Sequence, residues 1–187
     1  MAAAESSVER ELKFPVEGLE EMRERLVELQ AERLGPASFE DNWIFDRNGE
    51  LERRGCILRL RADGRGARIT FKGPRRFEGA VKVRVEHELA IDQHEEARAL
   101  FESLGFGAVR RYQKVREEWR LGGVVVALDH TPIGDYVEFE GDRAHVLARR
   151  CGLELEQAEK RSYLRLYDDY LREHPGAPPE MVFPQDG

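Results

Sequence analysis

The chain has 187 residues, of which 41% are hydrophobic and 36% are charged, and its formal net charge is −7. This length supports one domain with its own core, and the content of Leu, Val, Ile and Phe excludes a disordered chain. The negative charge argues against general nucleic-acid binding, although it allows a local basic site inside a cleft.

No apolar run approaches the length of a membrane span, and the start of the chain lacks the basic and then hydrophobic pattern of a signal peptide. Cys56 and Cys151 lie far apart with no metal-ligand spacing, which favours two buried free thiols over a disulfide. We therefore expect a cytoplasmic protein with no membrane or nucleic-acid partner, either a monomer or a homodimer.

The start of the chain predicts a flexible N-terminus, a strand and a helix. Residues 1–7 are small and polar, and we expect them to be flexible. Polar and apolar residues then alternate over 8–14, as in a strand. Apolar residues next recur at three- and four-residue steps, which predicts a helix over 17–34 that ends at Gly35-Pro36.

Strands dominate the middle of the chain. After the first, we expect strands at 39–46, 56–62, 67–72, 79–91, 110–121, 124–129 and 135–140. Turn signals such as Asp63-Gly64-Arg65-Gly66 and Gly122-Gly123 predict hairpins, so neighbouring strands should be antiparallel. Eight strands suit a small closed barrel, and a sandwich or an open sheet satisfies the same pattern.

Further helices are expected between and after the strands. Asp92 and Glu95 form a predicted capping box for a helix through Leu104, and helices at 141–151 and 162–172 should close the fold. Residues 173–187 carry four prolines and two glycines with little periodicity, which predicts a loose, Pro-rich tail. A single domain is therefore expected over 8–172.

The polar faces of the predicted strands carry charges in a dense alternating pattern. Over 81–88, for example, Lys82, Arg84, Glu86 and Glu88 alternate with valines. A solvated outer face would explain any single strand. The bulky apolar faces, however, require a cover of helices, and the charged faces would then converge inside a barrel. Carboxylates there would bind Mg²⁺ or Mn²⁺ and Arg and Lys would bind phosphate, so a metal–polyphosphate ligand fits.

The motif Glu9-Arg10-Glu11-Leu12-Lys13 resembles the Glu-x-Glu-x-Lys signature of the CYTH proteins, also called triphosphate tunnel metalloenzymes. The ordered motifs that follow it make the resemblance specific: Leu58-Arg59-Leu60-Arg61, Ile69-Thr70-Phe71-Lys72-Gly73-Pro74, Lys114-Val115-Arg116, Leu128-Asp129, Ile133-Gly134, Val137-Glu138-Phe139-Glu140 and Ser162-Tyr163. The resemblance extends from residue 8 to about 172. It implies an α+β fold, a closed eight-stranded antiparallel β-barrel forming a tunnel with flanking helices.

The resemblance also implies the site residues. Those implied to hold Mg²⁺ or Mn²⁺ are Glu9, Glu11, Asp129, Glu138 and Glu140, with Glu86 and Glu88 as weaker candidates. Those implied to bind the triphosphate are Lys13, Arg59, Arg61, Lys72, Arg84, Lys114 and Arg116. Among these we assign Lys72, Glu9 and Glu11 to catalysis.

The chain departs from the family pattern on the second strand. Many members carry an Asp-x-Tyr segment there, whereas this chain reads Asp41-Asn42-Trp43. A mechanism that relies on a Lys–Tyr pair is therefore in doubt, and a metal-activated water is the simpler hypothesis. Of the other aromatic residues, Tyr112 could stack a base but is better explained by packing under a helix, and Tyr163 belongs to a predicted core stripe.

Three functions fit these residues. We favour metal-dependent hydrolysis of a small-molecule triphosphate (inorganic triphosphate, thiamine triphosphate or a nucleoside triphosphate), because water is the default nucleophile and no adenine pocket is evident. A class IV adenylyl cyclase, converting ATP to cyclic AMP and pyrophosphate, is the alternative. A non-catalytic polyphosphate- or nucleotide-binding module is the third, although pure binding would need fewer carboxylates.

Overall fold

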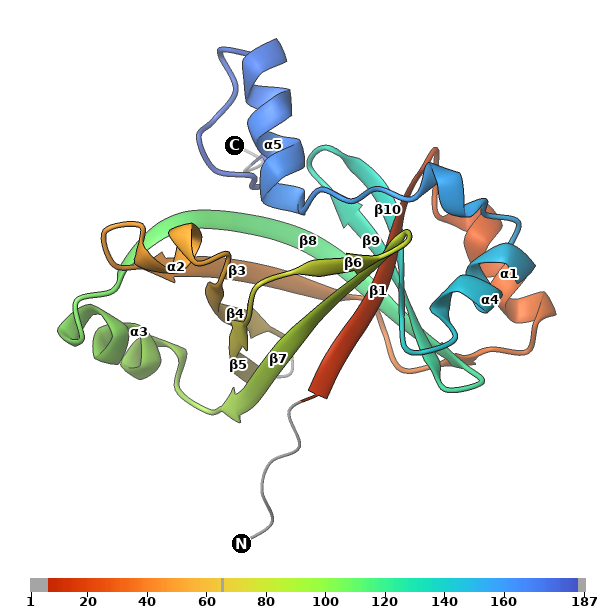
Figure 1. Ribbon diagram of the computed structural model, residues 1–187, viewed down its shortest axis with the longest axis horizontal. Helices are drawn as coiled ribbons and strands as arrows, with labels where there is room; N and C mark the ends of the chain where they lie inside the picture. Colours follow the sequence, from red (N-terminus) through yellow and green to blue (C-terminus); the bar gives the residue numbers. More distant parts are fainter. Residues whose placement is uncertain (1–6, 65, 185–187) are drawn as a thin grey trace, which may run out of the picture.

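The computed structural model describes residues 7–64 and 66–184, and within them ten strands form one antiparallel sheet (Figure 1). Eight of the described strands close the sheet into a barrel, in the order β1-β10-β9-β8-β3-β4-β5-β7, because β1 pairs with both β10 and β7. They are β1 (Ser7–Val16), β3 (Ser38–Asp46), β4 (Ile57–Asp63), β5 (Gly66–Lys72), β7 (Val81–Ile91), β8 (Gly107–Leu121), β9 (Val124–Thr131) and β10 (Gly134–Glu140). The predicted closed barrel is confirmed, and the sandwich and the open sheet are excluded.

Two short strands, β2 (Glu32–Arg33) and β6 (Arg76–Glu78), pair with β8 and β7. The helices are α1 (Glu20–Glu28), α2 (Glu50–Arg53), α3 (His94–Ser103), α4 (Ala144–Arg150) and α5 (Tyr163–Glu173), with a 3₁₀ turn at Leu155–Gln157. Helices α1 and α4 lie together on one side of the barrel, α3 lies on the opposite side, and α5 stands at one end (Figure 1).

The helices cover the apolar outer faces of the strands. Leu12 and Phe139, on β1 and β10, are buried in one cluster with Leu26 of α1 and Leu147 of α4. Around α3, a second cluster forms from Phe45, Leu60, Ala97 and Phe101. Because side chains alternate along a strand, covering the apolar faces outside turns the charged faces inward. The expected charged lumen follows from this arrangement.

Two predictions about helix ends were wrong. The helix predicted over 17–34 ends at Glu28, because Gln30 takes a left-handed conformation (φ 59°) and the chain then pairs with β8 as β2. The stripe of apolar residues is real, but only Met22 and Leu26 lie within the helix, while Leu19 and Leu29 are the residues that flank it. The predicted capping box of Asp92 and Glu95 does not form: Gln93 precedes α3, and no side chain caps that helix.

The predicted flexible N-terminus, residues 1–7, lies outside the described residues except for Ser7, which begins β1. The loose tail predicted from residue 173 is corrected for its described part, because Met181 is fully buried and bonds through its backbone to β8. Within the described residues Cys56 and Cys151 are buried and unpaired, as predicted. Along the same residues no helix is long and apolar enough to cross a bilayer.

Candidate active site

The barrel encloses a cavity of about 410 Å³ that is partly open to solvent. The inward side chains of the strands and the first turn of α5 form its walls. The lining residues are Glu9, Glu11, Lys13, Ile44, Ile57, Arg59, Arg61, Lys72, Lys82, Arg84, Glu86, Glu88, Tyr112, Lys114, Arg116, Glu118, Glu138, Glu140, Ser162, Tyr163 and Leu164. The structure thus brings every predicted site residue to this cavity except Asp129, which lies behind its wall.

Neighbouring strands β1 and β10 form an acidic wall. Their register places Glu11 opposite Glu140 and Lys13 opposite Glu138, and Glu9 lies two residues before Glu11 on the same face. Burial raises the pKa of Glu140 to about 7, and the carboxylates of Glu138, Glu9 and Glu11 add to this effect against the opposing influence of Arg116. The four glutamates are therefore close enough to repel one another.

Two lysines face this acidic wall. Lys72 Nζ lies 3.0 Å from Glu9 Oε1 and 2.7 Å from Glu86 Oε2, and Lys82 Nζ lies 2.6 Å from Glu11 Oε2. Burial alone would raise the pKa of Glu9, but Lys72 and its other neighbours lower it to about 2. Burial and the Glu9 carboxylate raise the pKa of Glu86. Lys82 was not assigned to the site, although its place in the alternating run would have identified it.

A second group of cations is held by Asp129. This carboxylate is fully buried and accepts bonds of 2.7 Å from Arg116 Nε and Nη2, 3.0 Å from Lys114 Nζ and 2.7 Å from the hydroxyl of Tyr163. Arg116 also bonds to Glu138 and lies 3.4 Å from Glu140. Asp129 thus holds Lys114 and Arg116 in place, and its oxygen atoms point at these two side chains rather than into the cavity.

Glu40, on β3, does not line the cavity but contacts two of its cations, and sequence reasoning missed it. Its buried carboxylate lies 3.0 Å from Arg61 Nη1 and 3.7 Å from Lys114 Nζ. Burial alone would raise its pKa, but Lys114, Arg116 and Arg61 lower it to about 2. The signal was present, because Glu40, Asn42 and Ile44 alternate with the outward residues of β3.

Arg59 and Arg84 reach the cavity in different ways. Arg59 bonds to the hydroxyl of Tyr112 at 3.3 Å and to Thr70 Oγ1 at 3.2 Å. Arg84 lines the cavity, but its Nε donates to the backbone carbonyl of Gly73 at 3.0 Å, so it also holds the chain after β5. Tyr112, predicted to pack under a helix, lines the cavity as well as packing near α5.

Within residues 7–64 and 66–184, no three carboxylate, imidazole or thiol groups are already arranged as a metal site. The reason is visible in the contacts, since Glu9, Glu11 and Glu138 each point at a lysine or arginine. The donor chemistry nevertheless fits a hard divalent cation, because the wall offers only carboxylate oxygens. A cation would also offset the burial, and the repulsion from neighbouring carboxylates, that together raise the pKa of Glu140.

The site is thus a cavity inside a closed barrel, with carboxylates on one wall and lysines and arginines around them. Residues 7–166 match the CYTH domain, so the chain belongs to the CYTH domain family. A protein of Methanocaldococcus jannaschii, provisionally named adenylate cyclase, is 25% identical over 134 residues, which are 71% of this chain and 76% of that protein.

Two solved structures share the fold. One, from Vibrio parahaemolyticus and also provisionally named adenylate cyclase, is 22% identical with a TM-score of 0.78, covering 88% of this chain and 99% of that chain. The other is from Hippeastrum, a provisionally named adenylyl cyclase described as having a dominant triphosphatase activity. It is 18% identical with a TM-score of 0.66, covering 87% of this chain and 95% of that chain.

Proposed function

We propose that this chain is a divalent-metal-dependent triphosphatase. The observation that carries the proposal is one cavity that brings Glu9, Glu11, Glu138 and Glu140 together on one wall and lysines and arginines around them. Binding of a triphosphate would replace the carboxylates as partners of these cations. Members of the family are triphosphatases or adenylyl cyclases, which supports an enzymatic role.

The metal would be Mg²⁺ or Mn²⁺, held by Glu9, Glu11, Glu138 and Glu140. When bound, it would supply positive charge against the phosphate oxygens and lower the pKa of water. Asp129, with its oxygens already bonded to Arg116, Lys114 and Tyr163, is a positioning residue in this proposal rather than a ligand. Glu86 and Glu88 are secondary candidates, since Lys72 lies against Glu86, and Arg68 and Thr70 bond to Glu88.

The cations would bind and straighten the phosphate chain. Lys72, Lys114 and Arg116 are nearly buried, so their charges are weakly screened and would contact phosphate oxygens strongly. Arg59 and Arg61, on β4, and Lys13, on β1, also line the cavity and would add to this set of phosphate-binding cations. Because Asp129 already holds Lys114 and Arg116 before the substrate arrives, these two cations would need little reorganisation when it binds.

The second candidate is cyclisation of ATP, supported by the names of the relatives from Methanocaldococcus jannaschii and Vibrio parahaemolyticus. Cyclisation would use the same cavity, with the ribose 3′-hydroxyl as nucleophile and pyrophosphate as leaving group. Water is the simpler nucleophile in a cavity that is partly open to solvent, and the activity described for the Hippeastrum protein favours hydrolysis.

The test is incubation of the purified protein and Mg²⁺ or Mn²⁺ with ATP, inorganic triphosphate and thiamine triphosphate. Release of phosphate supports hydrolysis. Formation of cyclic AMP and pyrophosphate supports the cyclase instead, and binding without turnover of any compound would leave a non-catalytic binding module. We further propose a cytoplasmic monomer or homodimer that acts on small molecules, because the net charge of −7 disfavours nucleic acid.

A further inference from the structure

The edge of β8 that faces β9 is covered by two different parts of the chain. Within the described residues, β9 pairs with 115–121 of β8. Nearer the start of β8, the same edge meets residues 180–183, which lie beyond the part of the chain that matches the CYTH domain. Gln113 donates its backbone N–H to the carbonyl of Met181 at 2.8 Å, and Met181 donates its own to the carbonyl of Arg111 at 3.3 Å. We call residues 180–183 the C-terminal strap.

Side chains also hold the strap against β8. Met181 is fully buried in a cluster that includes the ring of Tyr112, and the backbones of these two residues form a parallel bridge. Phe183 donates its backbone N–H to Oε1 of Gln113 at 3.1 Å, and its ring stacks on His130 with 5.4 Å between the ring centres. The strap is therefore fixed to the part of β8 that carries Tyr112.

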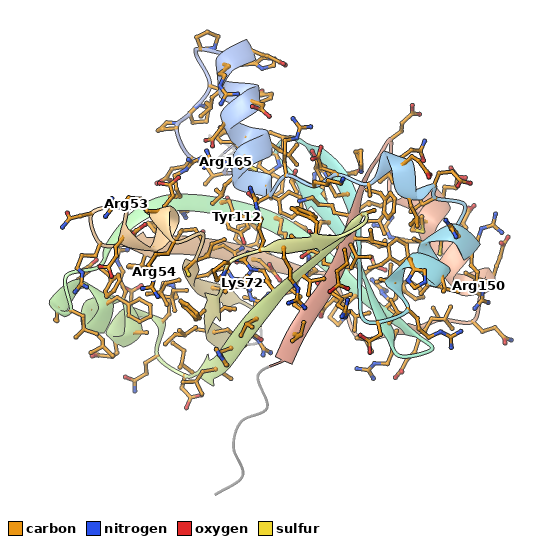
Figure 2. The ribbon with its side chains drawn as sticks, in the orientation of Figure 1. Arg53, Arg54, Lys72, Tyr112, Arg150 and Arg165 are labelled. Carbon is orange, nitrogen blue, oxygen red and sulfur yellow. The ribbon has the colours of Figure 1, made fainter. Side chains whose placement is uncertain are left out.

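The side chain of Tyr112 lines the cavity and contacts Arg59 there. Its hydroxyl accepts a hydrogen bond from Nη1 of Arg59 at 3.3 Å, and Oγ1 of Thr70 accepts one from Nη2 at 3.2 Å. Nε of Arg59 is buried and has no hydrogen-bond partner among the described residues, so a phosphate oxygen would satisfy it. Figure 2 shows Tyr112 between Lys72 and Arg165 of α5.

We infer that Tyr112 is a positioning residue for Arg59, and that the C-terminal strap keeps Tyr112 in place. This inference rests on the proposed function, because it concerns how the cavity binds a triphosphate. A guanidinium that is already held in one orientation loses less conformational freedom when it binds phosphate, so its contribution to affinity is larger. Residues outside the matched domain would thus control the affinity of the cavity through one hydroxyl group.

The first variant is Tyr112→Phe, which keeps the ring and removes the hydroxyl. We expect KM and the dissociation constant for triphosphate to rise about tenfold, since a misplacement of about 1 Å can cost about a hundredfold. The value of kcat should change less, because Glu9, Glu140 and Lys72 keep their places. Binding is measured by calorimetry with inorganic triphosphate and no divalent metal, and KM by phosphate release with Mg²⁺ or Mn²⁺.

The second variant is Met181→Ala, which removes the buried side chain of the strap. It should weaken triphosphate binding in the same way as Tyr112→Phe, although Met181 does not line the cavity. The double variant should bind as the Tyr112→Phe variant does, because both changes act through the contact of one hydroxyl with Arg59. A double-mutant cycle measures this coupling.

Two controls separate positioning from stability. Met181→Leu, of similar volume, should restore wild-type binding. Leu26→Ala creates a cavity in the fully buried cluster under α1 and should lower stability without changing the dissociation constant. All variants are compared at a temperature at which circular dichroism shows them folded. If Met181→Ala does not fold, Phe183→Ala, at a partly buried position of the strap, should show the same change to a smaller extent.

Wild-type binding by the Tyr112→Phe variant would overturn the inference, as would a wild type that binds no triphosphate. Independent effects of Tyr112→Phe and Met181→Ala in the cycle would overturn the role of the strap. If the wild type binds triphosphate but turns none over, the proposed function fails, whereas weaker binding by both variants would still support the inference.

Discussion

The hydroxyl of Tyr163, the first residue of α5, donates a hydrogen bond of 2.7 Å to Oδ2 of Asp129, on β9. Burial and the Asp129 carboxylate raise the pKa of Tyr163, so its hydroxyl keeps the proton that it donates. The same ring lies beneath Lys13, whose Nζ is 4.2 Å from the ring centre. Tyr163 therefore connects α5 to the cations that we propose bind phosphate.

Replacing Tyr163 with Phe should weaken this connection without removing the ring. The free energy of unfolding should fall by about 1.5–3 kcal/mol, the usual contribution of a hydrogen bond to a charged group. KM for the triphosphate should rise more than kcat falls, because Asp129 would hold Lys114 and Arg116 less firmly. Chemical denaturation and steady-state kinetics measure these effects.

Tyr167→Phe is the control, since the Tyr167 hydroxyl donates to the carbonyl of Pro178 at 2.7 Å, away from the cavity cations. That variant can lose stability but should keep its KM. A Tyr163→Phe enzyme with unchanged KM would show that Tyr163 only attaches α5.

Glu9→Gln and Glu140→Gln should each abolish metal-dependent turnover. Each change removes a carboxylate from the acidic wall, and rates should fall by more than about a hundredfold, since even the partners of metal ligands affect activity by about 10- to 100-fold. The measurement is the initial rate as a function of Mg²⁺ or Mn²⁺ concentration. Glu95→Gln, at an exposed position on α3, should behave as the wild type. Full activity after loss of both Glu9 and Glu11 would contradict the site assignment.

The strands of the barrel could be predicted because alternation and turn residues are visible in short segments of the sequence. Alternation over 79–91 and the hairpin at Gly122-Gly123 correspond to β7 and to the turn between β8 and β9. The end of α1 could not be predicted, because the left-handed conformation of Gln30 has no signal of its own in the sequence. The residues that were expected to continue the helix form β2, which pairs with β8.

The site residues on the strands could be predicted, because alternation along a strand determines which side chains face inward. Contacts that depend on how a helix packs against the barrel could not. The spacing of Tyr163 on α5 predicted a core stripe, and only the tertiary structure shows its hydroxyl at Asp129. The pairing of Asp129 with Arg116 follows from the register of β8 and β9. The predicted two-residue turn at Gly122-Gly123 fixes that register, so this pairing could have been read from the sequence. The contact of Asp129 with Tyr163 could not, because it depends on how α5 packs.

Lys72→Ala should mainly weaken triphosphate binding. Lys72 is nearly buried between Glu9 and Glu86, so its loss removes a cation and leaves the repulsion of two carboxylates uncompensated. We expect KM to rise about tenfold or more, in line with the strength of buried charge-assisted contacts. The comparison is with Arg172→Ala, whose side chain is exposed on α5 and should have no effect on KM. A normal KM in the Lys72→Ala enzyme would show that the phosphates bind elsewhere in the cavity.

Stability at low pH should depend on Glu40. Its pKa is about 2 in the folded protein against an ordinary value of 4.5, so the unfolded chain binds a proton more readily. The contribution of Glu40 is therefore complete above pH 4.5 and is lost as the pH falls toward 2. We expect Glu40→Gln to destabilise the protein by about 3 kcal/mol at pH 7, because Arg61 and Lys114 lose a buried partner. Urea denaturation from pH 7 to pH 2 should show this difference shrink across that interval, and a difference that stays constant with pH would show that Glu40 stabilises the fold by packing rather than by charge.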